Sequence, residues 1–243
     1  MARILVTGST DGLGRATAET LLRQGHDVIV HARSHRRAEA VSDLTRLGAD
    51  LVVADFADRD EVLAAAQRMQ AEPPVDGVVH NAGVISGAAV IPVNVVAPYL
   101  LTAVLTSASR HVYLSSSMHR GGRARVAGVD WSGGSASSSY SDSKLLVTAL
   151  AAAVATRWPS VQANAVDPGW VPTKMGGAGA PDDLELGHRT QERLIGDPDT
   201  MVSGGYWFHD RQQDPHPSVR DPQFQDELLL ALGAATGVAF PGR

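Results

Sequence analysis

Short runs of aliphatic and β-branched residues alternate with amphipathic segments along this chain, and this alternation limits its possible folds more than any other feature. Such runs predict buried strands, and the segments between them have the period of helices. We expect strands at 3–7, 27–32, 50–54, 75–80, 110–116, 161–167 and 204–208. We expect helices at 13–24, 35–47, 58–70, 93–108, 140–157, 183–195 and 222–234. The alternation predicts an α/β fold, a doubly wound parallel sheet of about seven strands flanked by helices.

Length and composition exclude several kinds of protein. A chain of 243 residues with 44% hydrophobic content can bury one core, so we expect residues 1–243 to form a single domain. The net charge of −5 and the scattered arginines offer no basic stripe for nucleic acid. Without cysteine there are no disulfides or thiolate sites, and the histidines lack the paired spacing of a metal site.

The start of the chain bears on its location. The first strand begins at Arg3, which leaves no room for a targeting peptide, and no apolar run reaches the length of a membrane span. We therefore expect a cytoplasmic protein with no membrane partner.

A glycine-rich turn, TGSTDGLG, follows the first predicted strand. Gly8 permits the tight turn, Gly12 lets the backbone approach a pyrophosphate, and Gly14 allows close helix packing. The GxxxGxG spacing differs from the GxGxxG of the standard dinucleotide fingerprint. The turn predicts a dinucleotide site in a Rossmann-type sheet. Its expected contacts are Gly8, Thr10, Asp11, Gly12, Leu13 and Gly14.

Cations follow the second predicted strand. Arg33, Arg36 and Arg37 lie where an acidic residue would otherwise hold a ribose 2′-hydroxyl, and a cation there can accommodate a 2′-phosphate. Asp11 acts in the opposite direction because it repels a phosphate. We expect NADP(H) to be favoured over NAD(H), with Arg33 as the contact. The alternative is that Arg36 and Arg37 only solvate a helix face.

The ends of the next two strands offer further cofactor contacts. Asp55 and Phe56 follow the third strand and could meet the adenine. Asn81, Ala82 and Gly83 follow the fourth strand in a turn of small residues that allows close contact with a ligand. Either stretch could also be an ordinary turn at a strand end.

Tyr140 and Lys144, one of only two lysines in the chain, stand four residues apart near a predicted helix start. At this spacing both side chains lie on one helix face. A nearby ammonium favours the phenolate, so we expect Lys144 to lower the tyrosine pKa towards the range of efficient proton transfer. The alternative is a solvated pair on the helix surface.

Serines end the fifth predicted strand in LSSSMH, residues 114–119. A hydroxyl here could donate a hydrogen bond to a substrate oxygen beside Tyr140, although serines at strand ends are more often turn formers.

Six motifs, TGSTDGLG, HNAG, the asparagine of PVNVVAPYLL, LSSS, YSDSK and DPGWVPT, occur in this order. Together they closely resemble the classical short-chain dehydrogenase/reductase family over essentially the whole chain. The resemblance implies a catalytic tetrad of Asn94, Ser116, Tyr140 and Lys144. The serine is assigned as the second of the SS pair, while Ser115 and Ser117 remain possible.

The resemblance also implies a role for each member of the tetrad. Tyr140 gives a proton to a carbonyl oxygen that Ser116 polarises, while the nicotinamide gives hydride to the carbon. Lys144 holds the ribose and lowers the tyrosine pKa, and Asn94 holds a water for proton relay. The DPGWVPT segment cradles the nicotinamide through Pro168, Gly169, Val171 and Thr173.

Two spacings depart from the usual family pattern. The segment between Asn81 and Asn94 is shorter, which bears on the role of Asn94, and the segment between Ser116 and Tyr140 is longer. This insertion and the stretch 203–221 resemble the subgroup that includes retinol dehydrogenases and bacterial carbonyl reductases.

The inserted loop and a glycine-rich flap, GGAGAP at 176–181, should wall the substrate cleft. Its expected lining is Met118, His119, Trp131, Trp170 and Met175, which suits a rather apolar or aromatic carbonyl compound. Alternatively, Trp131 and Met175 pack in ordinary loops.

The predicted activity is the interconversion of a carbonyl and an alcohol on a small molecule. Two other functions stay open: a non-catalytic NADP(H)-binding regulator, against which Tyr140 and Lys144 argue, and an isomerase or dehydratase, which usually needs a larger C-terminal domain. The alanine-rich helix from Tyr140 is apolar on more than one face. With the family resemblance, this predicts a homodimer or homotetramer that packs on the second face.

Overall fold

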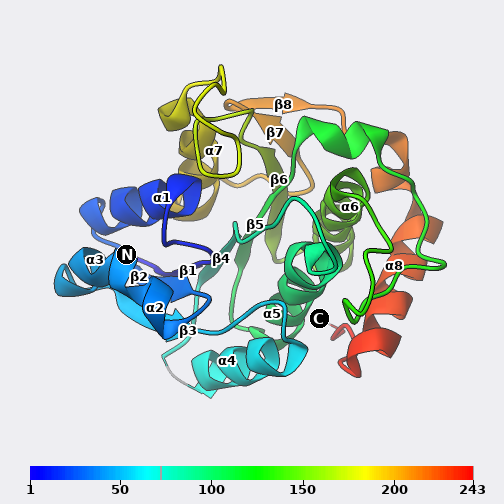
Figure 1. The fold of residues 1–243 in the computed structure, drawn as a ribbon, viewed down its shortest axis with the longest axis horizontal. Helices are drawn as coiled ribbons and strands as arrows, with labels where there is room; N and C mark the ends of the chain where they lie inside the picture. The colour runs from blue at the N-terminus through cyan, green and yellow to red at the C-terminus, as the bar shows by residue number, and fades with distance from the viewer. Residues whose placement is uncertain (72, 243) are drawn as a thin grey trace.

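The computed structural model describes residues 1–71 and 73–242, and within them an eight-stranded sheet lies between two layers of helices (Figure 1). The strands are β1 (Arg3–Val6), β2 (Asp27–Ala32), β3 (Asp50–Val53), β4 (Gly77–His80), β5 (Arg110–Leu114), β6 (Gln162–Asp167), β7 (Tyr206–Phe208) and β8 (Arg211–Gln213). The α-helices are α1 (Gly12–Arg23), α2 (His35–Ala38), α3 (Ser42–Arg46), α4 (Arg59–Ala71), α5 (Ala97–Val104), α6 (Tyr140–Arg157), α7 (Leu184–Gly196) and α8 (Pro222–Thr236). Short helical turns are η1 (Glu39–Val41), η2 (Pro92–Val96), η3 (Ser117–Gly121) and η4 (Pro217–Arg220).

The strand order is β3-β2-β1-β4-β5-β6-β7-β8, and all pairs are parallel except β7 with β8. This confirms the predicted doubly wound α/β sheet. The winding reverses between β1 and β4, because Val6 pairs with Val30 of β2 on one side and with Val79 of β4 on the other. A ligand crevice forms at such a reversal, beyond the carboxyl ends of the strands.

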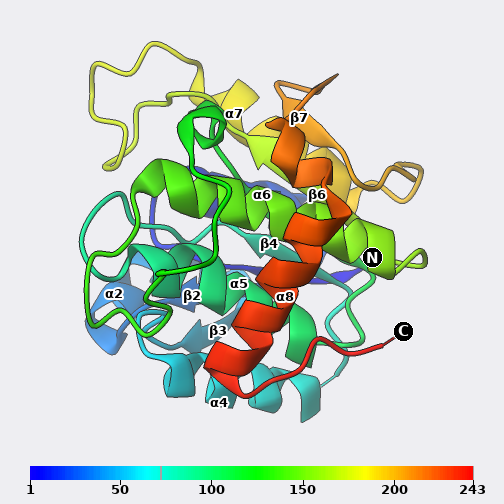
Figure 2. The same ribbon diagram turned by 90° about the vertical axis from the view of Figure 1, so that its right-hand side faces the viewer.

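Two apolar clusters fill the spaces between the sheet and the helix layers on its two faces. One joins the sheet to α1, α3 and α7 through residues such as Leu21, Leu44 and Leu194. The helices α4, α5, α6 and α8 cover the other face (Figures 1 and 2), and the larger cluster joins them to the sheet. Because both faces are covered, the central strands are buried, which explains their continuous aliphatic runs.

The structure differs from the sequence prediction in three places. The helix expected at 35–47 is split into α2, η1 and α3, and the one expected at 93–108 opens with the π-helical turn η2 and ends at Val104. The strand β8 was not predicted. It forms a hairpin with β7 across His209 and Asp210, whose φ angles are 45° and 63°. A tight hairpin with no glycine at these positive φ angles carries no sequence signal.

The second face of α6, expected to meet another subunit, is covered by the chain's own C-terminal segment (Figure 2). The helix α8 packs on α6, and beyond it the Trp158 ring stacks on Phe240 with centroids 4.3 Å apart. Trp158 Nε1 donates to the carbonyl of Pro241 at 2.9 Å, and the Tyr99 hydroxyl donates to that of Val238 at 2.6 Å. The prediction of a subunit contact on this face is therefore wrong, because α8 and the tail occupy it.

Among the described helices, none is both long and apolar enough to cross a membrane.

Candidate active site

The glycine turn lies at the reversal of the sheet, as predicted. Gly8 and Gly12 have φ angles of 67° and 54°, which side chains rarely adopt. A Cβ atom on Gly14 would lie 2.6 Å from the carbonyl oxygen of Gly8 and would also overlap Asn81 Nδ2. The three glycines therefore set the shape of the turn and bring its backbone close to any bound group, which fits a pyrophosphate at the start of α1.

The turn after β4 is fastened to the glycine turn. Asn81 Nδ2 donates to the carbonyl of Thr7 at 2.8 Å, and the backbone amides of Asn81 and Ala82 both donate to Thr7 Oγ1 at 2.9 Å. A Cβ on Gly83 would stand 3.3 Å from Asn94 Oδ1 and 3.9 Å from Lys144 Nζ. The turn 81–83 thus connects the glycine turn with Asn94 and Lys144, two of the predicted catalytic residues.

His31, which was not among the predicted site residues, forms a hydrogen bond with the backbone of the glycine turn. Its Nδ1 accepts from the amide of Gly8 at 2.9 Å, so its Nε2 carries the hydrogen that is donated to the carbonyl of Ala54 at 2.9 Å. Its ring stacks on Phe56 at 3.9 Å. The Phe56 side chain is buried, and the contact of this residue with an adenine stays a prediction. The sequence feature that could have indicated the role of His31 is a histidine inside the apolar strand VIVHA.

Burial lowers the pKa of His31 to about 4 from an ordinary 6.5. The unfolded chain therefore binds a proton at a pH where the folded protein does not. The resulting stability is complete above pH 6.5 and is lost as the pH falls towards 4.

We predict that between about pH 7.5 and about pH 5 the wild type loses about 2 kcal/mol more unfolding free energy than the His31→Gln variant, which cannot titrate there. Urea unfolding of both proteins at both pH values measures the difference. Equal losses in the two proteins would show that His31 is not buried in its neutral form.

The segment after β2 carries the predicted cations: Arg33 lies in the loop, and Arg36 and Arg37 lie in α2. Arg37 Nη2 donates to Thr10 Oγ1 at 2.7 Å and to Asp11 Oδ2 at 2.9 Å, so this side chain lies against the glycine turn. Arg33 is exposed at the end of β2. The Asp55 side chain is also exposed and accepts from the amide of Ala57 at 3.0 Å.

The start of α6 is fixed by a capping box. Ser139 Oγ accepts from the amide of Asp142, and the Asp142 carboxylate accepts from the amide of Ser139. Arg123 of the inserted loop donates to both carboxylate oxygens of Asp142. Because the cap defines the first residue of the helix, Tyr140 begins α6, and Lys144 follows one turn later.

Lys144 is buried behind Tyr140. Its Nζ donates to the carbonyl of Leu114 at 2.6 Å and lies 5.4 Å from the centre of the Tyr140 ring. Burial lowers the pKa of Lys144 to about 8, although Asp167 opposes the shift. Burial raises the pKa of Tyr140 to about 12, and Asp167 adds to this rise. The prediction that Lys144 lowers the pKa of Tyr140 is wrong in this structure, because desolvation is the larger effect.

Asp167, at the end of β6, is a buried acidic residue of this corner. It accepts from the Tyr206 hydroxyl and from the amide of Gly169, both at 3.0 Å. Its position in the DPGWVPT motif did not predict a role for it. Only the fold shows that its carboxylate influences the pKa of both Tyr140 and Lys144.

Asn94 lies in η2 and connects two segments of the site. Its Nδ2 donates to the carbonyl of Val84 and to Ser143 Oγ, and its Oδ1 accepts from the amide of Val84, all at 2.9 Å. Ser143 Oγ in turn donates to the carbonyl of Tyr140. Both N–H groups of the Asn94 side chain are thus used by the protein. Its amide group links the turn after β4 to α6, and the expected role of holding a water stays a prediction.

The structure separates the serines at the end of β5. Ser115 is buried, and its hydroxyl contacts Thr148 Oγ1 at 2.6 Å. Ser116 is half-buried and caps η3, where its Oγ accepts from the amide of Met118 at 3.3 Å. That bond uses Ser116 only as an acceptor, so its O–H can still donate. Lys144 Nζ donates to the carbonyl of Leu114, two residues before Ser116, and η3 packs against α6, so the end of β5 lies close to the first turns of this helix.

The structure places three of the five residues predicted to line the substrate cleft at one edge of the sheet. Met118, Trp170 and Met175 are exposed at the carboxyl edge of the sheet. The Trp170 indole is 60% exposed and donates to the carbonyl of Gly176 at 2.7 Å, so the flap holds it in place. The remaining members of DPGWVPT lie beside it: Pro168 and Thr173 are half-buried and Val171 is buried.

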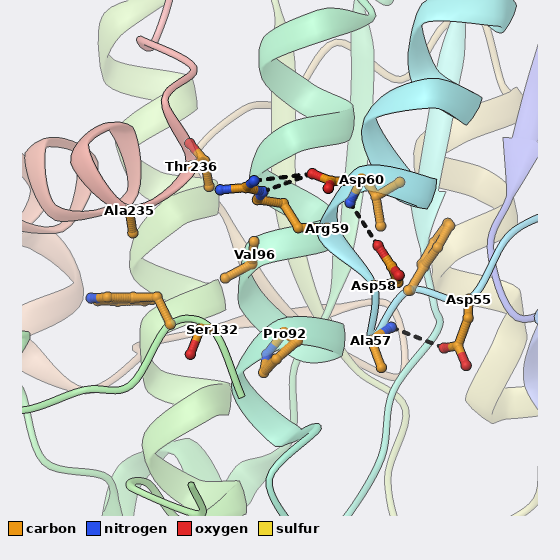
Figure 3. Close-up of a pocket in the computed structure, with 13 residues that line it drawn as sticks. Asp55, Ala57, Asp58, Arg59, Asp60, Pro92, Val96, Ser132, Ala235 and Thr236 are labelled. Atoms are coloured by element: carbon orange, nitrogen blue, oxygen red, sulfur yellow. Dashed lines mark hydrogen bonds and ion pairs between the residues drawn. The ribbon is translucent and has the colours of Figure 1, made fainter. Parts of the chain in front are cut away.

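Two predicted wall residues lie elsewhere. His119 is 0% exposed, and both of its ring nitrogens bond to the backbone. Nδ1 donates to the carbonyl of Ser116, and Nε2 accepts from the amide of His216. The prediction that His119 lines the cleft is therefore wrong. Trp131 lines a separate cavity of about 580 Å³. Figure 3 shows this cavity, which lies between the Asp55 loop, η2 and the end of α8. Among the described residues that line this cavity, none belongs to the predicted tetrad.

A metal-binding cluster of three histidine, aspartate or glutamate side chains does not occur within residues 1–71 and 73–242.

Comparison with known proteins identifies relatives of the whole chain. Residues 2–183 match the family described as short chain dehydrogenase. An uncharacterized oxidoreductase of Emericella nidulans is 36% identical over the full length of both chains. The short-chain dehydrogenase chyC of Penicillium rubens is 34% identical over 99% of this chain and 100% of its own.

Solved structures share the fold. An uncharacterized protein from Mycobacterium paratuberculosis superposes with a TM-score of 0.79 at 23% identity over 99% of this chain and 95% of its own. A structure named as a short chain dehydrogenase of Shigella flexneri complexed with NADP has a TM-score of 0.70 at 24% identity, over 86% of this chain and 97% of its own.

Proposed function

The chain belongs to the short-chain dehydrogenase/reductase family, whose members are oxidoreductases that bind NAD(P), and on this premise we propose its reaction. It is an NADP(H)-dependent enzyme that interconverts a carbonyl and a secondary or primary alcohol on a rather apolar small molecule. The observation that carries the proposal is the corner in which Tyr140 begins α6, with Lys144 buried behind it and Ser116 at the neighbouring strand end.

Each residue of this corner has a separate role in the proposed reaction. A reduced nicotinamide held by the glycine turn and Lys144 would supply the hydride for the carbonyl carbon. Tyr140 donates its phenolic proton to the carbonyl oxygen, and Ser116 donates a hydrogen bond to the same oxygen, so the product is an alcohol. Lys144 is positioned to hold a ribose hydroxyl through its ammonium group. Asn94 maintains the distance between the turn after β4 and α6 through Val84 and Ser143.

Burial and Asp167 raise the pKa of Tyr140 to about 12, so the phenol carries its proton at neutral pH, as the donor role in carbonyl reduction requires.

A screen tests the activity. Purified protein is mixed with NADPH and a panel of apolar and aromatic ketones and aldehydes, and the absorbance of the reduced nicotinamide is followed. Consumption with at least one compound supports the proposal. Cofactor binding without turnover on the whole panel would favour the non-catalytic regulator instead.

The preference for NADP(H) is supported by Arg33 and Arg37 after β2 and by the NADP held in the Shigella flexneri structure. We predict that Arg33→Ala weakens NADPH binding about tenfold, the loss of one charge-assisted contact, and changes NADH binding less than about twofold. Titration of the nicotinamide fluorescence measures both affinities. An equal loss for the two cofactors would contradict the assignment.

An assembly of two or four subunits remains part of the proposal, through a surface other than the covered face of α6. Light scattering at micromolar concentration measures the mass, and a monomer alone would refute it.

A further inference from the structure

Three charged side chains from separate segments meet beside the glycine turn. Asp11 belongs to the turn, Arg37 to α2, and Lys174, the second of the two lysines, to the loop after Val171 that leads into the flap. Lys174 Nζ lies 2.7 Å and Arg37 Nη2 lies 2.9 Å from the same carboxylate oxygen of Asp11. Thr173 lies against the turn as well, since its Cγ2 is 3.0 Å from where a Cβ on Gly12 would stand.

Asp11 occupies the N-cap position of α1 without acting as a cap. An aspartate at this position usually accepts from the second or third amide of the helix. Within the described part of the chain, the Asp11 side chain makes no such bond, and its oxygen is held by the two cations instead. The amides at the start of α1 therefore stay available for an anion.

The negative charge of Asp11 conflicts with a 2′-phosphate at the end of β2. Arg37 would have to serve both the carboxylate and the phosphate, and the two anions would repel each other. A second cation on Asp11 removes this conflict. Burial by itself would raise the pKa of Asp11, but hydrogen bonds from Lys174 and Arg37 hold it below its ordinary value, so the carboxylate is ionised and paired.

We propose that Lys174 is a positioning residue for cofactor choice: it neutralises Asp11 and so leaves Arg37 able to bind the 2′-phosphate of NADP(H). The inference rests on the proposed NADP(H) preference. It assigns the loop that leads into the flap a part in recognising the adenosine end of the cofactor. NADH, which lacks the phosphate, gains nothing from Lys174.

The test measures equilibrium binding of NADPH and NADH to the full chain by calorimetry, without any substrate. Lys174→Met should weaken NADPH about fivefold and leave NADH unchanged, because one partly screened charge is lost. Lys174→Arg keeps the charge and should keep the affinity. Arg46→Met, which removes an exposed cation on α3, is the matched control and should alter neither affinity.

Asp11→Asn separates charge from packing. In the Asp11→Asn background there is no carboxylate to neutralise, so adding Lys174→Met should cause no further loss of NADPH affinity. An equal loss of NADPH and NADH in Lys174→Met, or a full additional loss in the double variant, would overturn the inference. Wild-type protein that binds NADH more tightly than NADPH would instead overturn the cofactor preference, so the two failures are distinguishable.

Discussion

Tyr140→Phe should lower the turnover of a carbonyl substrate by about a thousandfold or more, because it removes the acid that protonates the carbonyl oxygen. The phenyl ring keeps the shape of the side chain at the start of α6, where the capping box of Ser139 and Asp142 determines the helix start. We therefore expect NADPH affinity to stay within about twofold of the wild type. Turnover is measured with the best compound of the screen, and affinity by fluorescence titration.

The matched control is Tyr99→Phe. It removes a hydroxyl that donates to the carbonyl of Val238 in the C-terminal tail, on the side of the molecule covered by α8. This variant should keep its turnover. If Tyr140→Phe retained more than a trace of activity while Tyr99→Phe behaved normally, the proton donor would have to be another group of the site.

Gly14→Ala should cost about 2 kcal/mol of unfolding free energy, in the range of overpacked sites, and weaken NADPH binding by more than about tenfold. The added methyl group would stand 2.6 Å from the carbonyl oxygen of Gly8 and would overlap Asn81 Nδ2, so backbone has to move. Asn81 holds the carbonyl of Thr7, and its displacement would distort the turn that faces the pyrophosphate. Urea unfolding and cofactor titration measure the two effects.

Gly179→Ala is the control for a glycine substitution as such. A Cβ on Gly179 meets nothing within 4 Å, so both quantities should stay at wild-type values. Normal stability together with normal NADPH affinity in Gly14→Ala would mean that α1 does not pack against the glycine turn as described.

The local pattern of apolar residues was sufficient to predict most of the architecture. Each parallel strand and the helices α1, α4, α6, α7 and α8 follow from the alternation of apolar runs and helical periods, since burial on both faces dictates those runs. The broken helix after β2, the π-helical turn at Asn94 and the hairpin of β8 do not follow from it. Their geometry depends on contacts with distant segments, or on positive φ angles at His209 and Asp210 that no glycine announces.

The candidate site shows the same division. The motifs named Gly14, Asn81, Tyr140 and Lys144, and the structure groups them around the crevice of the sheet. Residues that act through these groups were missed or misplaced, because their partners are remote in sequence. Asp167 influences Tyr140 from β6, whereas His119, predicted at the substrate wall, is buried by its bond to His216.

The sequence by itself determined the family, the winding of the sheet and the residue types at the reacting corner, because periodicity and motif spacing are local properties. The tertiary structure decided the charge state of that corner, the covered face of α6 and the meeting of Lys174 with Asp11. These depend on desolvation and on distances between segments far apart along the chain, and a linear pattern specifies neither.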